Sequence, residues 1–217
     1  MPIIIMAGND TQYLFDATLR RFAAADYEVA SFADSPPSGP QGIDDGPRRY
    51  YNSDNGTFSD LVVAPDRFNR IAERLAFAAG VDAPTVYIAS GYRETLISAQ
   101  PYNRGNVIFF GEAFQLKQNG QELETKDLPD ELVAAFVANM IAHIALGHMQ
   151  SSPTSTFELH ENVYSADALG AKLLCDVGLS ANSAVEAFIA FGSRPRSTES
   201  HPDDFSRMEA LKIISCS

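Results

Sequence analysis

The side chains best able to bind a metal ion are the four histidines, His143, His148, His160 and His201, all in the second half of the chain. Neutral imidazole is a common zinc ligand, and zinc-bound water is a strong nucleophile at neutral pH. His143 and His148 are five residues apart in an apolar stretch. On one continuous α-helix their rings would lie roughly 140° apart around the axis, too far to share an ion unless a π-bulge absorbed one residue. The spacing of the histidines alone therefore does not define a zinc site.

The stretch that leads to His143 carries more information than the histidine itself. Residues 130–143, DELVAAFVANMIAH, begin acidic and continue through small apolar residues. This stretch resembles the active-site helix of the gluzincin peptidases related to CAAX prenyl protease and HtpX. In that family an A-H-E-x-x-H motif supplies two zinc-binding histidines and a glutamate that acts as general base. The three matching positions here hold Asn139, Met140 and His143.

A second segment resembles the next helix of the same family. Residues 161–170, ENVYSADALG, follow the pattern E-x-x-A-D-x-x-G. The family's third zinc ligand, a glutamate, is replaced by Val163, whereas Asp167 matches the aspartate that orients a zinc-bound histidine. The resemblance therefore implies a hydrogen bond between Asp167 and His143.

A third segment, residues 200–207 (SHPDDFSR), resembles the family element S-H-P-x-x-x-x-R. The resemblance implies that His201 and Arg207 support the site from around the ligand positions. The three segments occur in the family's order within residues 84–217, whereas residues 1–60 match nothing in the family.

The resemblance implies a protein that keeps the architecture of a peptidase but has lost the catalytic activity. No catalytic residue is expected at the degenerate site, and no zinc or other cofactor, because a thioether cannot replace a general base. We expect a non-catalytic homologue that binds a peptide or protein through the inherited cleft, beside an edge strand within residues 96–110. The degenerate positions are Asn139, Met140, His143 and Val163.

Two alternatives stay open. The chain could be an active zinc metalloendopeptidase with substitute histidine ligands, for which the candidates are His143, His148 and His160. It could also be a purely structural or interaction domain whose cleft is filled.

Composition limits the classes of partner. The chain has 217 residues, of which 45% are hydrophobic and 20% charged, in the range of one folded domain, residues 1–217. The net charge of −12 disfavours nucleic acid and anionic membrane surfaces. No apolar run reaches the roughly 20 residues that span a bilayer. Cys175 and Cys216 do not suggest a disulfide framework, so we expect a cytoplasmic protein by default, or an exported one if a leader has been removed.

The ordered resemblance of the three segments implies an α+β fold of the zincin-like gluzincin type, mainly helical, with a small sheet against the helix that carries His143. Apolar spacing and turn residues predict its individual elements. Gly178 is predicted to cap the C-terminus of a helix. The Pro- and Gly-rich residues 35–47 are predicted to form a loop. The expected helices are 13–25, 65–79, 129–149, 158–177, 183–191 and 202–214, and the expected strands are 3–6, 85–89 and 106–110.

Overall fold

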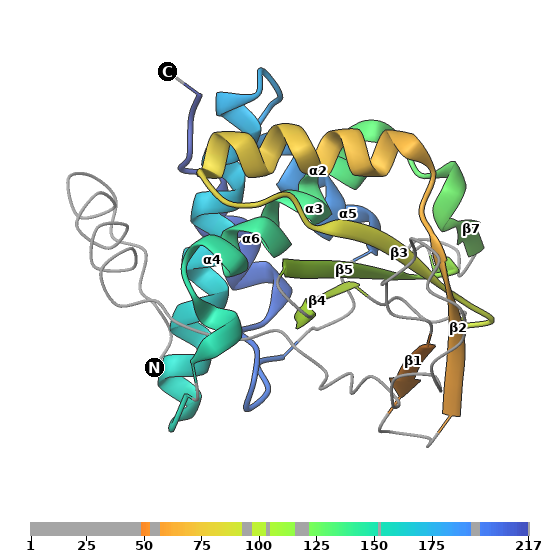
Figure 1. The fold of residues 1–217 in the computed structure, drawn as a ribbon. Helices are drawn as coiled ribbons and strands as arrows, with labels where there is room; N and C mark the ends of the chain where they lie inside the picture. The colour runs from red at the N-terminus through yellow and green to blue at the C-terminus, as the bar shows by residue number, and fades with distance from the viewer. Residues whose placement is uncertain are drawn as a thin grey trace.

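The computed structural model describes residues 49–52, 57–92, 97–102, 105–115, 122–151, 153–191 and 196–216. In this part of the chain strands and helices are mixed in an α+β arrangement (Figure 1). The strands are β1 (Arg49–Asn52), β2 (Thr57–Val63), β3 (Thr85–Ser90), β4 (Ile97–Tyr102), β5 (Gly105–Gly111), β6 (Ala113–Gln115) and β7 (Glu122–Glu124). The helices are α2 (Asp66–Ala79), α3 (Asp130–Ala145), α4 (Thr156–Asp176), α5 (Asn182–Phe191) and α6 (Asp204–Leu211), with short 3-10 turns η1 (Thr125–Asp127) and η2 (His148–Gln150).

The main sheet is mixed, with strand order β1-β2-β3-β5-β4. Only β3 and β5 pair in parallel, and β1–β2, β2–β3 and β4–β5 are antiparallel. β4 is therefore an edge strand of the described sheet, and it contacts both α3 and η2. A separate pair, β6 and β7, is antiparallel.

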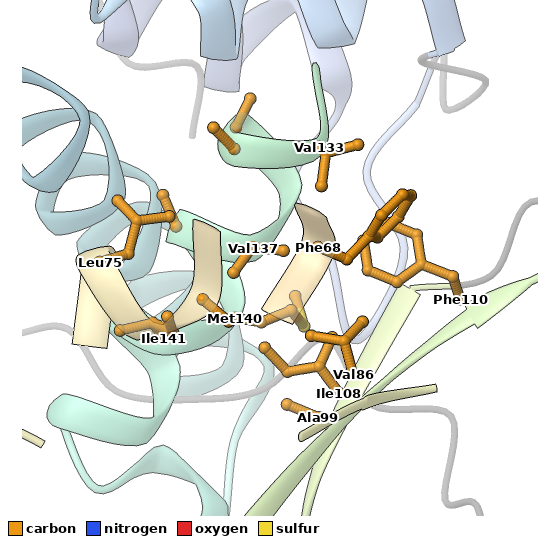
Figure 2. Packing of buried hydrophobic residues seen from close by; sticks show 14 of the residues in the cluster. Phe68, Leu75, Val86, Ala99, Ile108, Phe110, Val133, Val137, Met140 and Ile141 are labelled. Atoms are coloured by element: carbon orange, nitrogen blue, oxygen red, sulfur yellow. The ribbon is translucent and has the colours of Figure 1, made fainter. Parts of the chain in front are cut away.

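One apolar face of the sheet packs against α2 and α3 and forms the largest core cluster. Alternate strand residues point to this face, as the two-residue period of a strand requires. Figure 2 shows side chains of both helices meeting those of the strands, with Phe68 and Leu75 from α2, Val137, Met140 and Ile141 from α3, and Val86, Ala99, Ile108 and Phe110 from the sheet.

Local sequence explains where the helices begin. Ser155 caps α4 by accepting a hydrogen bond from the backbone N–H of Glu158 at 3.2 Å, and Glu158 in turn accepts one from the N–H of Thr154 at 2.6 Å. Asp203 caps α6 by accepting from the N–H of Ser206 at 2.8 Å. Both caps fix helices that carry residues of the candidate site.

The helix predicted at residues 129–149 ends earlier than expected. α3 stops at Ala145, because Gly147 adopts a left-handed conformation with φ of 73° and the chain turns into η2. His148 therefore does not continue the helix of His143. The argument that five residues of helix keep the two rings apart is wrong for this chain.

The other predictions within the described residues agree with the structure to within a few residues, including α2, β3, β5, α4 and α5. The last helix is shorter, ending at Leu211 rather than residue 214. β1, β2, β6 and β7 were not anticipated. The strand expected at 3–6, the helix at 13–25 and the loop at 35–47 lie outside the described residues.

The expectation that the two cysteines do not form a disulfide framework is also wrong. Cys175, near the end of α4, forms a disulfide with Cys216 in the tail after α6, with their Cα atoms 5.2 Å apart. Such bonds persist mainly in oxidising compartments. The cysteine argument for a reducing compartment therefore fails.

Candidate functional site

The candidate site lies where α3, α4 and α6 meet. Gly170 of α4 lets the two long helices come close: a Cβ at this position would lie 3.1 Å from the backbone nitrogen of Asn139. The helices that carry His143 and Asp167 thus pack against each other, as expected for the resemblance. This close approach brings polar side chains from all three helices together in the interior.

The centre of the site is the carboxylate of Asp167. Asn139 donates its amide Nδ2–H to Oδ1 of Asp167 at 2.8 Å. Arg207 of α6 donates Nε–H to Oδ2 at 2.8 Å and Nη2–H to Oδ1 at 2.9 Å. This two-pronged pairing is the geometry in which arginine binds carboxylate most tightly. The expected bond from Asp167 to His143 is therefore wrong, because the carboxylate is bound by Asn139 and Arg207 instead.

The ion pair is buried, with side-chain exposures of 6% for Arg207 and 5% for Asp167. Burial raises the pKa of Asp167 above its ordinary value, against the opposing effect of the Arg207 guanidinium. The guanidinium also lies over the ring of Phe188 of α5, 4.5 Å from its centroid. Arg207 thus connects α6 to α4 and to α5 at one point.

The second polar feature is a pair of facing imidazoles. Because Gly147 turns the chain back, His148 comes to lie against His143, with their Nδ1 atoms 2.9 Å apart. Both rings are buried, at 3% and 0% exposure. Burial lowers the pKa of His143 well below its ordinary value, and the charges of His148 and Arg207 lower it further. A hydrogen bond of this length between two imidazoles requires one protonated and one unprotonated Nδ1.

The remaining predicted site residues are apolar or have other contacts. Met140 belongs to the main core at 4% exposure, and Val163 is fully buried. His160 places Nε2 2.8 Å from the carbonyl oxygen of Thr198. His201 places Nδ1 2.6 Å from the hydroxyl oxygen of Ser200, and burial and Arg207 lower its pKa to about 4.

The donor set does not fit zinc. Zinc in proteins takes three or four nitrogen, sulfur or oxygen donors. Across the described segments, no three His, Cys, Asp or Glu side chains come together so that they could hold a metal ion. The Nδ1 atoms of His143 and His148 are 2.9 Å apart, closer than the roughly 3.3 Å between two nitrogens on one tetrahedral zinc. We therefore derive no chemical step through a metal.

Two site residues were not singled out from the sequence. Tyr164 is half-buried beside α6, and burial raises its pKa to about 12 while a hydrogen bond with Ser206 opposes the rise. Asn162 is fully buried, and neither atom of its side-chain amide has a hydrogen-bond partner among the described residues.

Comparison with known proteins adds no further constraint. No protein-family model, curated protein or solved structure matches the chain. Nor does any helix in the described part of the chain have the length and apolar character needed to cross a membrane. Function must therefore be argued from the geometry of the site.

Proposed function

We propose that this chain is a non-catalytic homologue of the gluzincin zinc peptidases, with a zincin-like fold, that binds a peptide or protein segment beside β4. The proposal combines the ordered sequence resemblance with three features of the described residues: the α3–α4 contact, the replaced ligand positions and the edge strand next to them. Each of these features supports a different part of the proposal.

The observation that carries the proposal is the 2.8 Å hydrogen bond between Asn139 and Asp167. In the resembled family the aspartate of the second helix holds a zinc-binding histidine of the first. Here Asp167 also contacts a motif position of the first helix, but that position is Asn139 rather than His143, with an amide in place of an imidazole. This supports the alignment of Asn139 and His143 with the two histidines of the motif, rather than one built on His148.

Loss of catalysis follows from the residues at the other positions. Peptide hydrolysis needs a metal-activated water and a base within hydrogen-bond reach of it. Met140 accepts no proton from water, and Val163 offers no lone pair to a metal. The Asn139 amide is engaged with Asp167. Three of the four positions that performed the reaction in the resembled family therefore cannot perform it here.

Peptide binding is argued from β4. Among the described strands only β5 pairs with it, so the backbone groups on its other edge have no partner strand there. Pro101 carries no N–H, so the other residues of β4 would have to supply the donors. An extended peptide can add to such an edge by backbone hydrogen bonds, without any metal. β4 also contacts α3 and η2, which places this edge close to the degenerate site.

Zinc and activity measurements test the first half of the proposal. Protein purified without added metal should contain no stoichiometric zinc. Cleavage of casein and of mixed peptides with added zinc should not exceed a chelated control. Reproducible cleavage that disappears in His143→Ala would instead establish an active enzyme.

Hydrogen exchange tests the second half. A panel of unstructured peptides of varied sequence should include members that slow exchange at alternate backbone amides of β4. The opposite edge strand, β1, provides the internal control and should not respond. Equal protection of both edges, or protection of neither by any peptide, would rule out binding at β4.

One observation favours a second candidate, an active zinc metalloendopeptidase with substitute ligands. His143 and His148 do face each other, which the sequence argument did not expect for a continuous helix. His160, the third candidate ligand, instead contacts the carbonyl oxygen of Thr198. Chelator-sensitive zinc that is lost in both His143→Ala and His148→Ala would favour this candidate over the first.

A further inference from the structure

The last part of the described chain, residues 204–216, lies across two longer helices. We call it the C-terminal strap; it consists of α6 and the tail that follows. Its apolar side chains Met208, Leu211 and Ile214 form one cluster with residues of α4, of α5 and of the turn between them. Those residues are Ala171, Cys175, Ala181, Ala184, Val185 and Phe188.

The strap is attached by two links, one at each end. At its N-terminal end Arg207 forms the buried ion pair with Asp167. At its C-terminal end Cys216 forms the disulfide with Cys175. Of these two cysteines Cys216 is solvent-exposed, so a small thiol can reach its sulfur.

The strap has little stability of its own. α6 has 8 residues, and isolated helices shorter than about 12–15 residues are marginal in water. A buried ion pair gives little net stability, because both charges have lost their water. Leu211 is the only one of the strap's three apolar anchors that is fully buried. The covalent bond is thus the link that keeps the end of the chain in place.

We propose that the C-terminal strap is a redox-controlled latch: oxidation of Cys175 and Cys216 holds it on α4 and α5, and reduction releases it. Release uncovers the apolar seat formed by α4 and α5 and removes Arg207 from Asp167. The proposal does not depend on whether the chain descends from a peptidase, because it concerns only contacts within the described residues.

The opening step is thiol–disulfide exchange with a dithiol. One thiolate of the dithiol attacks the Cys216 sulfur, the S–S bond breaks, and Cys175 leaves as a thiolate that takes up a proton. The second thiol of the reductant then displaces Cys216. The dithiol ends as a disulfide, and its two electrons and two protons end on the two cysteines.

Hydrogen exchange of the whole chain with and without dithiothreitol tests the latch. Alkylation of both cysteines after treatment confirms that the bond has been reduced. Backbone amides of residues 204–216 should then exchange faster, by a factor at least about ten times larger than any acceleration in α3. Cys216→Ser should show the fast exchange without any reductant and should not respond to it.

Ile213→Ser is the matched control, because it changes an exposed neighbour and keeps the disulfide. It should behave like the unmodified chain before and after reduction. Three results would overturn the proposal: unchanged protection of residues 204–216 after complete reduction, a loss of protection in α3 as large as that in residues 204–216, or two free thiols in protein never exposed to reductant.

Discussion

At the scale of single residues, the site is controlled by one buried carboxylate and the groups that surround it. Asp167 accepts hydrogen bonds from Asn139 and from two nitrogens of Arg207. A carboxylate in the interior is tolerated only when its charge and its lone pairs are matched. The stability of the whole α3–α4–α6 junction therefore depends on Arg207.

Removing the partner of that carboxylate should be costly. Arg207→Met leaves Asp167 as an unpaired buried charge and should lower the free energy of unfolding by about 3–5 kcal/mol. Adding Asp167→Asn removes that charge while keeping an acceptor for Asn139, so the double variant should lose less than Arg207→Met alone. Urea denaturation measures both. The control Lys212→Met, at an exposed position, should change stability by about 0.5 kcal/mol or less.

An equal loss in Arg207→Met and Lys212→Met would show that the ion pair does not stabilise the junction. A double variant less stable than Arg207→Met would show that the junction needs a carboxylate at position 167 even when Arg207 is absent.

His201 should make stability depend on pH. Its pKa is lowered to about 4 in the folded chain, first by burial and then by Arg207, from 6.5 in the unfolded chain. Between these values the unfolded chain binds a proton that the folded chain does not, so stability falls as pH falls. From pH 7 to pH 5 this contribution amounts to about 2 kcal/mol. His143, whose pKa is also lowered, adds a change of the same sign.

Urea denaturation of His201→Gln at pH 7 and pH 5 checks this, and the variant should lose less stability on acidification than the unmodified chain. Ser200→Ala is the control: it removes the Nδ1 contact but leaves the ring buried, so it should keep most of the pH dependence. If the unmodified chain and His201→Gln lose the same free energy of unfolding between pH 7 and pH 5, His201 is not the source of the pH dependence.

At the scale of elements, the close approach of α3 and α4 sets the geometry of the site. It depends on Gly170, at which a Cβ would meet three backbone atoms of Ala138 and Asn139 at 3.1–3.2 Å. Backbone atoms of a packed helix cannot move aside individually. Any side chain at this position must therefore push the two helices apart.

Gly170→Ala should thus lower stability by about 1–3 kcal/mol, although alanine is the better helix former by about 1 kcal/mol. It should also lengthen the contact between Asn139 and Asp167. Gly105→Ala is the matched control, because nothing lies within 4 Å of a Cβ at that position. Thermal unfolding of both variants measures the difference. A Gly170→Ala variant as stable as the unmodified chain would mean that the helices are less tightly packed than described.

At the scale of the whole molecule, the proposed ancestry can be tested by rebuilding the motif. The triple variant Asn139→His, Met140→Glu, Val163→Glu places two carboxylates at positions that are now 4% and 0% exposed. Without metal it should be less stable than the unmodified chain, because buried carboxylates lose hydration. With zinc its Tm should rise, since a ligand that binds only the folded state at 1,000 times its Kd stabilises by about 4 kcal/mol.

Thermal unfolding with and without zinc measures the effect, and the triple variant carrying His143→Ala as well should not respond. We expect zinc binding to return before peptidase activity, because binding needs only the donors whereas turnover also needs a shaped cleft. A triple variant that folds but ignores zinc would mean that the alignment is wrong and must be rebuilt around His148.

The sequence by itself determined which helices form and which chemical groups are missing. The 3.6-residue period of apolar side chains is a local property, so α2, α4 and α5 were found close to their true bounds. That Asn139, Met140 and Val163 lack the groups of a zinc peptidase is a statement about residue types, and folding cannot change it. The α+β class was predicted from the ordered resemblance of three segments to a known family.

Only the tertiary structure decided which residues meet. Asp167 binds Asn139 and Arg207 rather than His143, because the partner of a buried carboxylate depends on how α3, α4 and α6 pack. His148 faces His143 because one left-handed residue, Gly147, changes the direction of the chain. The period of apolar residues in a helix does not reveal such a change. The bond from Cys175 to Cys216 spans 41 residues of sequence, and such a pair is brought within bonding distance only by the packing of the helices between them.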